Sequence, residues 1–450
     1  MKTFTSLVLV ILSTLHILAQ TASFPEATMH RIEQSIQLPK IPNYRIELQT
    51  LGAKGDSISD NKPFFDQAMA LCKQHQGGTI VVPAGIFTLN GPIHFTSNVR
   101  LELSKGAKIR FSDNPIYYPN VLTSWEGTLL YNYSPLIYAI NCTNIAITGE
   151  GIIDGEGSQR WNSFKAQENA DKMLSREMNH KNIPLEKRQF GQGHFLRPQL
   201  IQFFRCKNIL VENIRIEDSP FWCLHLLQSQ SITVRGVSYH AHNKNNDGID
   251  PEYSKNILIE KVTFDNGDDN IAVKSGRDHE GRSNATMPSH NIIIRNCQFK
   301  GLHALVLGSE MSAGVHHVFI ENCKAWGYLK RGIYFKTNAD RGGYIKQIYA
   351  RNIAFKEVED CLFVTSNYMS EGSNFPSAIS NAYFTNISCE KANDNGIVVQ
   401  GFPTKKVKNL YFSNISIQTA KSPLTITNSE NVFMNEINIG PKAVAPSFVK

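Results

Sequence analysis

Three aspartates in two short segments have the residue type and the spacing that acid–base chemistry requires. Asp247 lies in the segment Asn-Asn-Asp-Gly-Ile-Asp, and Asp268 and Asp269 follow Gly267, starting 21 residues further on. Hydrolysis of a glycoside needs a protonated carboxyl that donates to the leaving oxygen and an ionised carboxyl that activates water. Crowding raises the pKa of one carboxyl and so separates the two roles. Two other interpretations stay open, turn aspartates that bind backbone amides and ligands of calcium.

Three further residues are candidates for the same neighbourhood. His303 lies in Gly-Leu-His-Ala, although a lone histidine more often has a structural role. Lys336 ends Arg-Gly-Ile-Tyr-Phe-Lys, and its charge would neutralise a substrate carboxylate, although an isolated lysine is more often solvated. Lys274, which follows the aspartates, either tunes their pKa or lies on the surface. These residues act together only if the fold brings their segments together.

A short alternating apolar run around an asparagine recurs along the chain. These runs predict the strands that would bring the candidate segments together. From Ser254 onward the copies start 22 to 35 residues apart, and each contains a strand of ~4–6 residues. We expect the asparagine to occupy a left-handed bend or to form a ladder between coils. The copies begin at Cys142, Cys206, Ser254, Ser289, Val315, Ile345, Ile379, Val407 and Ser429.

Short strands at this period, joined by turns, predict an all-β solenoid. The expected architecture is a single right-handed parallel β-helix over residues 21–450, with neighbouring strands ~4.8 Å apart. Asp247 and Asp268 are one short coil apart and would therefore lie on adjacent strands. Because consecutive residues of a regular strand face opposite sides, we expect a bend or bulge at Gly267 to turn both Asp268 and Asp269 toward a cleft.

The ends and interruptions of the repeat complete this prediction. A helix that Asp60 caps, with Phe64, Phe65, Ala68, Leu71 and Cys72 on one face, ends at Gly77 and Gly78 and should cover the first coil. Residues 155–200 have lost the repeat, and we interpret them as a long loop over the cleft. A second insertion covers about residues 277–290.

The first 20 residues are typical of a cleavable signal peptide, with Lys2 before an apolar run from Leu7 to Leu18 that is too short to span a bilayer. We therefore expect a secreted or periplasmic protein without a membrane anchor, and a monomer. Eight cysteines without a CxxC pair favour buried free thiols over disulfides or metal ligands. The formal net charge of +7 suits an acidic polysaccharide better than nucleic acid, because the basic residues are dispersed.

The four candidate segments, in this order, resemble the polygalacturonase family of pectin hydrolases, glycoside hydrolase family 28. The turns at residues 52–56, 82–85 and 149–155 are also similar to those of the family. The resemblance implies that Asp268 is the general acid, that Asp247 and Asp269 activate water with inversion at the anomeric carbon, and that His303 supports them. It implies no metal ion and no organic cofactor.

The chain departs from the family at the basic motif. Arg-Ile-Lys is replaced by Tyr334-Phe335-Lys336, so the lysine matches and the arginine does not. An arginine grips a uronate carboxylate with two hydrogen bonds and a tyrosine cannot. Tyr334, Lys336 and the nearby Arg331 are therefore the substrate-binding candidates. The glycines usual beside the family histidine are Leu302 and Ala304 here.

The resemblance predicts cleavage of α-linked galacturonic acid bonds in homogalacturonan or rhamnogalacturonan. Exo action on chain ends is favoured over endo action, because residues 155–200 and 277–290 would wall off an open cleft. Two alternatives remain. One is a calcium-dependent pectate lyase on the same fold, which cleaves by β-elimination, and the other is a β-helical protein that binds polysaccharide without cutting it.

Overall fold

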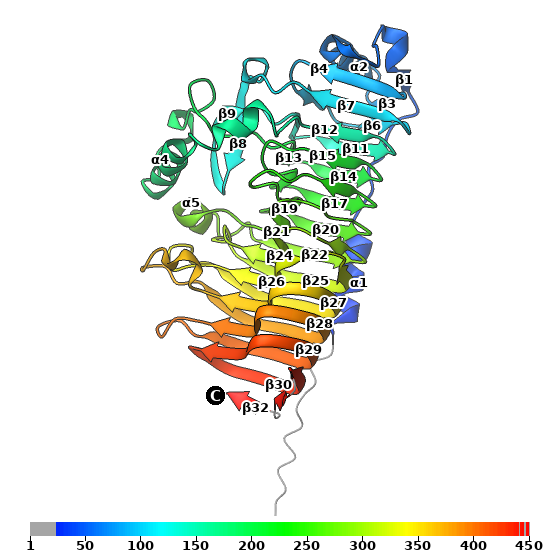
Figure 1. Ribbon diagram of the computed structural model, residues 1–450. Coiled ribbons are helices and arrows are strands. Elements are labelled where there is room, and N and C mark those ends of the chain that lie inside the picture. The colour runs from blue at the N-terminus through cyan, green and yellow to red at the C-terminus, as the bar shows by residue number, and fades with distance from the viewer. Residues whose placement is uncertain (1–23, 441, 445–446, 450) are drawn as a thin grey trace, which may run out of the picture.

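The computed structural model describes residues 24–440, 442–444 and 447–449, which form an elongated stack of coils (Figure 1). Almost all strand pairings in the stack are parallel, so the predicted all-β class and parallel β-helix are confirmed. The predicted signal peptide lies outside the described residues. Among the helices that the structure describes, none combines the length and the apolar character needed to cross a bilayer.

One face of the solenoid carries the segments with the candidate residues. Its strands pair in chain order, each with the equivalent strand of the next coil. We call it the cleft face, and it continues into the later parts of the long strands β27 (Tyr344–Thr365), β28 (Ala378–Gln400) and β29 (Val407–Thr427). Its shorter strands are β5 (Ile93–His94), β10 (Ile137–Ile140), β13 (Ile201–Phe204), β16 (Leu224–Leu227), β19 (Ile249–Glu252), β21 (Asp269–Val273), β24 (His303–Gly308) and β26 (Leu329–Lys336).

The remaining strands form the other two faces. The second face contains β1 (Arg45–Glu47), β3 (Gly78–Val82), β6 (Val99–Leu103), β11 (Thr143–Gly149), β14 (Lys207–Glu212), β17 (Gln230–Arg235), β20 (Lys255–Glu260), β22 (Ser289–Arg295), β25 (Val315–Ala325), the first parts of β27 to β29, and β30 (Ser429–Ile439). The third contains β2 (Asp56–Asp60), β4 (Gly85–Leu89), β7 (Ala107–Phe111), β12 (Ile152–Asp154), β15 (Arg215–Glu217) and β18 (Ser238–His240), and β23 (Gln298–Phe299) pairs with the end of β25.

The core forms because equivalent positions of successive coils stack. Ile249 pairs with Ile271, Ile271 with Leu305, and Leu305 with Ile333, and all four side chains are buried. Polar ladders run along the bends in the same way: the amides of Asn352, Asn386 and Asn414 bond in sequence, and each residue has a positive φ. Both roles predicted for the repeated asparagine are therefore confirmed.

The predicted helix at the start of the solenoid is confirmed as α2 (Lys62–Gln74), which buries Phe65, Ala68, Met69 and Cys72 against the first coils. Its N-cap residue is Asn61 and not Asp60, although the Asp60 carboxylate accepts a hydrogen bond from the Lys62 N–H. The short 3-10 helix η1 (Leu48–Leu51) packs beside α2. At the other end β31 (Lys442–Val444) and β32 (Ser447–Val449) pair antiparallel with β30.

The interpretation of residues 155–200 as a loop was wrong. The segment contains α3 (Arg160–Phe164), α4 (Asn169–His180) and the short η3 (Leu185–Lys187), and the second insertion contains α5 (Asp278–Ser283). The physical reason is that α4 buries Asp171, Ser175 and Asn179, so the helix has polar groups where an apolar stripe would identify it. Asn179, for example, bonds to the Thr128 hydroxyl and the Arg277 carbonyl.

Two more elements lie outside the coils and were not predicted. The helix α1 (Glu26–Ser35) lies across later coils of the second face (Figure 1), where Met29 and Ile32 pack on Leu258, Ile293 and Phe319. The antiparallel hairpin of β8 (Asn120–Trp125) and β9 (Thr128–Tyr133) stands over the cleft side. The short helices η2 (Pro115–Tyr117) and η4 (Tyr368–Ser370) lie in connecting segments.

The cysteines provide a first test of this fold. All eight are free and buried, as predicted from the sequence. We therefore expect the native protein to resist a chromogenic disulfide reagent, and all eight thiols to react once the chain is unfolded. Dithiothreitol should leave the thermal unfolding temperature unchanged. Rapid reaction of the native protein would contradict this packing.

Candidate active site

The candidate residues of the cleft face form a column that crosses successive coils. Asp269 at the start of β21 is in register with His303 of β24, and His303 is in register with Arg331 of β26. Asp247 lies one coil earlier, where the Gly248 N–H donates to the Asp269 carbonyl. The structure therefore brings together segments that are far apart in the sequence.

A bend at Gly267 places the two adjacent aspartates. A side chain at Gly267 would put a Cβ 2.6 Å from the His242 carbonyl oxygen of the preceding coil, which explains why this position needs glycine. After the bend Asn270 is buried and its amide donates to Asn266 Oδ1 and the Lys300 carbonyl. One side-chain oxygen or nitrogen atom of each of Asp268, Asp269 and His303 consequently lies within 4.8 Å of the other two.

Asp269 is held as a carboxylate. Its Oδ1 is 2.5 Å from His303 Nδ1 and its Oδ2 is 2.7 Å from Lys336 Nζ. Burial opposes ionisation, but the charge of Lys336 and the bond to His303 lower the pKa of Asp269 well below its usual range. Both oxygens of Asp269 are therefore occupied by protein donors. His303 Nε2 is buried without a hydrogen-bond partner among the described residues.

Asp268 has the opposite electrostatic environment. Its side chain is partly exposed, and its Oδ1 accepts a hydrogen bond from the Asp269 N–H at 3.0 Å. Burial and then the negative charge of Asp269 raise the pKa of Asp268 above its ordinary value. The neighbouring aspartates therefore differ in protonation, since Asp268 retains its proton to higher pH and Asp269 is ionised.

Asp247 lies beside the carboxyl of Asp250, for which the sequence had suggested no role. Asp247 is 3% exposed, and Asp250 of the same segment is fully buried. Lys274 Nζ lies 3.4 Å from a carboxylate oxygen of each. Burial and Asp250 raise the pKa of Asp247 well above its usual range, and Lys274 opposes that shift. The burial of Lys274 shows that it is not a surface residue.

The substrate-binding candidates lie next to His303. The Arg331 guanidinium carbon lies 4.4 Å from the ring centroids of both Tyr334 and Phe363, and Arg331 Nε is 2.9 Å from Asp360 Oδ2. Its terminal nitrogens make no hydrogen bond with any described residue. Tyr334 is buried, and burial raises its pKa to about 12.

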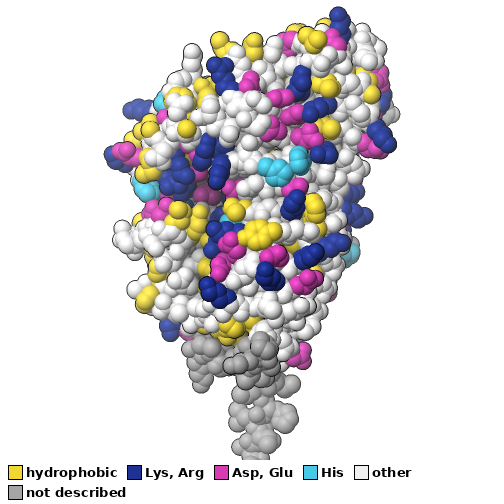
Figure 2. Space-filling view, in the orientation of Figure 1, with side chains coloured by type: hydrophobic (Ala, Val, Ile, Leu, Met, Phe, Trp, Pro, Cys, Tyr) yellow, Lys and Arg dark blue, Asp and Glu magenta, His cyan; other side chains and the backbone are white. Residues whose placement is uncertain are grey.

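One end of the cleft face is covered by the insertions. Thr123 and Ser124 of the β8–β9 hairpin bond to Gln202 and Glu252 on the cleft face. Between α4 and α5, His180 Nε2 lies 3.0 Å from Asp278 Oδ2. Lys, Arg, Asp and Glu side chains gather in the hollow between this region and the later coils (Figure 2).

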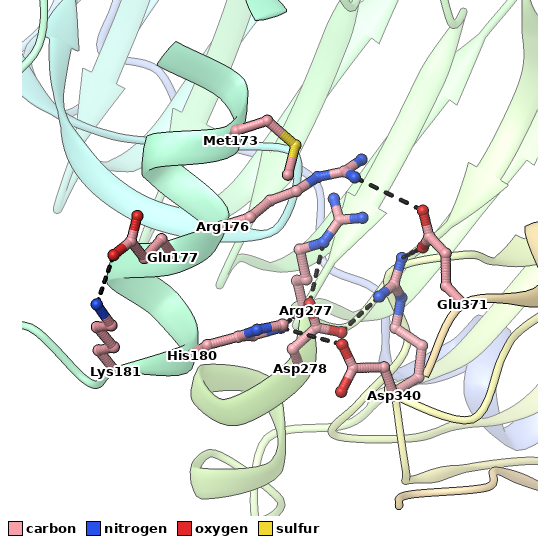
Figure 3. A pocket seen from close by; sticks show the side chains of 10 residues that line it. Met173, Arg176, Glu177, His180, Lys181, Arg277, Asp278, Asp340 and Glu371 are labelled. Carbon is pink, nitrogen blue, oxygen red and sulfur yellow. Dashed lines mark hydrogen bonds and ion pairs between the residues drawn. The ribbon is translucent and has the colours of Figure 1, made fainter. Parts of the chain in front are cut away.

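A pocket of about 400 Å³ lies at the meeting of α4, α5 and two later loops (Figure 3). Each of its cations has a carboxylate partner, for example Arg176 with Glu371 and Arg341 with Asp278. Arg341 is 1% exposed and belongs to this ion-pair network. The pocket is lined by Met173, Arg176, Glu177, His180, Lys181, Arg277, Asp278, Asp340, Arg341 and Glu371.

Trp222 is not a platform for sugar stacking. It is 3% exposed, its ring stacks on Phe221, and Lys274 Nζ lies 4.4 Å from its ring centroid. The indole therefore packs inside the protein and covers Lys274.

A parallel β-helix whose cleft face carries two adjacent carboxyls with pKa values shifted in opposite directions has the architecture and the groups of a polysaccharide-cleaving glycosidase. The model of the family "Glycosyl hydrolases family 28" matches residues 72–435. The chain belongs to this family. It is therefore a pectin-degrading glycoside hydrolase that acts on galacturonan, and inversion is typical of the family. The family and enzyme class predicted from the sequence are confirmed, and the hydrolase is favoured over the lyase and the binding protein.

Individual proteins support this assignment. A probable polygalacturonase of Vitis vinifera is 29% identical over 92% of this chain and 84% of its own length. An endo-polygalacturonase of Pectobacterium parmentieri is 28% identical over 88% of this chain and 92% of its own. The crystal structure of a hyperthermoactive exopolygalacturonase from Thermotoga maritima superposes with a TM-score of 0.90 at 33% identity, covering 95% of this chain and 99% of that one.

The ionisation of the adjacent aspartates predicts the effect of removing Lys336. An opposite charge this close lowers a carboxyl pKa by about 1–3 units. In Lys336→Met the pKa of Asp268 should rise, so the alkaline limb of the pH profile of kcat/KM should move to higher pH by about one unit or more. Lys391→Met, at an exposed ion pair, is the control. An unchanged profile in a folded Lys336→Met protein would contradict this electrostatic assignment.

Proposed function

We propose that this protein hydrolyses α-linked galacturonic acid bonds of pectin by a single displacement at the anomeric carbon. Asp268 donates its proton to the leaving oxygen, and Asp247 and Asp269 orient and activate the attacking water. The observation that carries this proposal is that Asp268 and Asp269 are in contact while their surroundings shift their pKa values in opposite directions. The pairing of Asp269 with Lys336 and His303 supports it, because an ionised neighbour helps Asp268 to keep its proton.

We assign Arg331 to a uronate carboxylate on the leaving-group side. The family arginine is absent, but Arg331 lies beside His303 in register and its guanidinium lies against the rings of Tyr334 and Phe363. Its unbonded terminal nitrogens have the fork geometry that matches a carboxylate. Lys336 bonds to Asp269. Lys336 therefore contributes to substrate binding through the Asp269 carboxylate and through its own positive charge.

We further propose exo action. The β8–β9 hairpin, α4 and α5 close one end of the cleft face, and their contacts tie the two insertions together. A chain end would fit such a site better than the middle of a polymer. The exopolygalacturonase from Thermotoga maritima and an exo-poly-alpha-D-galacturonosidase of Dickeya chrysanthemi, 28% identical over 74% of this chain and 58% of its own, are consistent with this mode.

The remaining expectations concern the protein in the cell. The first 20 residues support export of the protein to the periplasm or the medium. We propose that the exported protein is a soluble monomer, since a single chain contains all of the proposed catalytic groups.

Product analysis tests the reaction and its mode. On oligogalacturonates, with a chelator present, the wild type should release small saturated products from chain ends, and Asp268→Asn should be slower by about 10²–10⁴-fold because it lacks the acid. Asp394→Asn is the control, an aspartate on a later coil. Unsaturated, chelator-sensitive products would overturn the hydrolytic mechanism, and a random distribution of product lengths would overturn exo action.

Substitution of Arg331 tests the uronate contact. A hydrogen-bonded charged group contributes about 1.5–3 kcal/mol, so Arg331→Leu should lower kcat/KM by about 10- to 100-fold, chiefly through KM. Arg331→Lys should recover part of that loss, because it keeps the charge without the fork. Arg351→Leu, at an ion pair on the second face, is the control. If KM on galacturonate oligomers is unchanged in Arg331→Leu, the assignment is wrong.

A further inference from the structure

A buried cluster of one ammonium and three carboxyls lies directly beneath the proposed active site. Lys274 is 2% exposed, and its Nζ lies 3.4 Å from Asp247 Oδ2, 3.4 Å from Asp250 Oδ1 and 3.4 Å from Glu310 Oε2. The indole of Trp222 covers it. Lys274 therefore has no access to substrate, and whatever it does for catalysis it does through its carboxyl neighbours.

The three carboxyls are not equivalent. Glu310 has two cations besides Lys274, since its Oε1 lies 3.4 Å from Arg277 Nη1 and 3.9 Å from Arg341 Nη2. Burial opposes its ionisation, but Lys274, Arg277 and Arg341 lower the pKa of Glu310 well below its usual range. Glu310 is therefore a permanent anion, balanced by the arginines. The positive charge of Lys274 is therefore available to balance Asp247 and Asp250.

Asp247 and Asp250 share one cation, Lys274, and both carboxyls are buried. Two adjacent carboxylates in such a place cannot both ionise without a large cost, so the pair keeps one proton to high pH. Burial raises the pKa of Asp250 to about 8, and Lys274 limits this rise. The other charged groups that face the pair are Asp268 and Asp269, both of which disfavour a second negative charge.

The surroundings decide which carboxyl carries the proton. Asp250 is 0% exposed and neither of its oxygens has a hydrogen-bond partner among the described residues, whereas Asp247 Oδ2 accepts a hydrogen bond from Lys274 Nζ at 3.4 Å. A neutral carboxyl is far cheaper to bury without partners than an anion. We propose that Lys274 is a positioning residue, whose ammonium holds Asp247 in the ionised form that activates water while the buried Asp250 carries the proton of the pair.

This inference rests on the proposed role of Asp247 in hydrolysis. It explains how Asp247 acts as a base although burial and Asp250 both work against its ionisation. It also separates two kinds of contribution, since Asp247 and Asp268 are proposed to act on the reacting atoms, whereas Lys274 acts from beneath the cleft floor.

A charge-matched pair of variants tests the proposal. Asp250→Asn is an uncharged isostere of a protonated aspartic acid, so it should fold and keep kcat within about fivefold of the wild type. Lys274→Met alone leaves buried carboxyls without their cation and is expected to be unstable. The double variant Lys274→Met with Asp250→Asn removes one acid and one base together and should therefore fold.

The double variant should nevertheless be impaired. Without the ammonium the pKa of Asp247 rises, so the acid limb of the pH profile of kcat should move up by about one unit or more and kcat at pH 5 should fall by about tenfold or more. KM should change little, because Lys274 does not touch substrate. Asp250→Asn alone should keep the wild-type acid limb.

Three results would overturn the proposal. A wild-type pH profile in the double variant would show that Lys274 merely neutralises Asp250, and loss of activity in a folded Asp250→Asn protein would show that Asp250 acts as an anion. A loss confined to KM would place Lys274 in substrate binding. Asp268→Asn, measured in parallel, separates this inference from the proposed function: if it stays active, the catalytic assignment itself fails.

Discussion

The site depends on the in-register stacking of parallel strands. Strands of neighbouring coils lie about 4.8 Å apart, so side chains at equivalent positions are forced into columns. Inward columns such as Ile249, Ile271 and Leu305 form the core, and the same register brings Asp269 and His303 together at the first residues of β21 and β24. Ionisable groups at this spacing change one another's pKa, and the chemistry of the cleft is therefore a property of the stack and not of single residues.

Electrostatic pairing then assigns a state to each acid in the column. Asp269 is balanced by Lys336 and His303, and Lys274 lies against Asp247, while no cation of the described residues forms an ion pair with Asp268. Burying charges in this way is costly, and removing one partner leaves the other uncompensated. The same network that separates acid from base therefore makes the cleft floor sensitive to single substitutions.

The features that shape the cleft of this protein lie mainly in the segments inserted between the coils. The coils supply a rigid floor, and α4, α5 and the β8–β9 hairpin build a wall on it through polar contacts such as Asn179 with Arg277 and Arg188 with Glu280. Loops and insertions on a regular scaffold commonly set substrate access in this way. An end covered by insertions and an Arg331 that lies against two aromatic rings distinguish this cleft from the arrangement implied by the family motif.

Much of the fold was readable from the sequence because its signals are local. The alternation of apolar residues, the repeated asparagines and the lone cysteines each follow from a position within one coil, and the glycine before Asp268 indicated the bend. The helix α4 was missed because it buries polar residues such as Asn179. The surroundings of Lys274 and Arg331 were equally out of reach, since their partners come from other coils. The sequence by itself determined the stacked strands and the candidate acids, whereas only the tertiary structure decided which acid is ionised, because a pKa depends on neighbours that are distant in the chain.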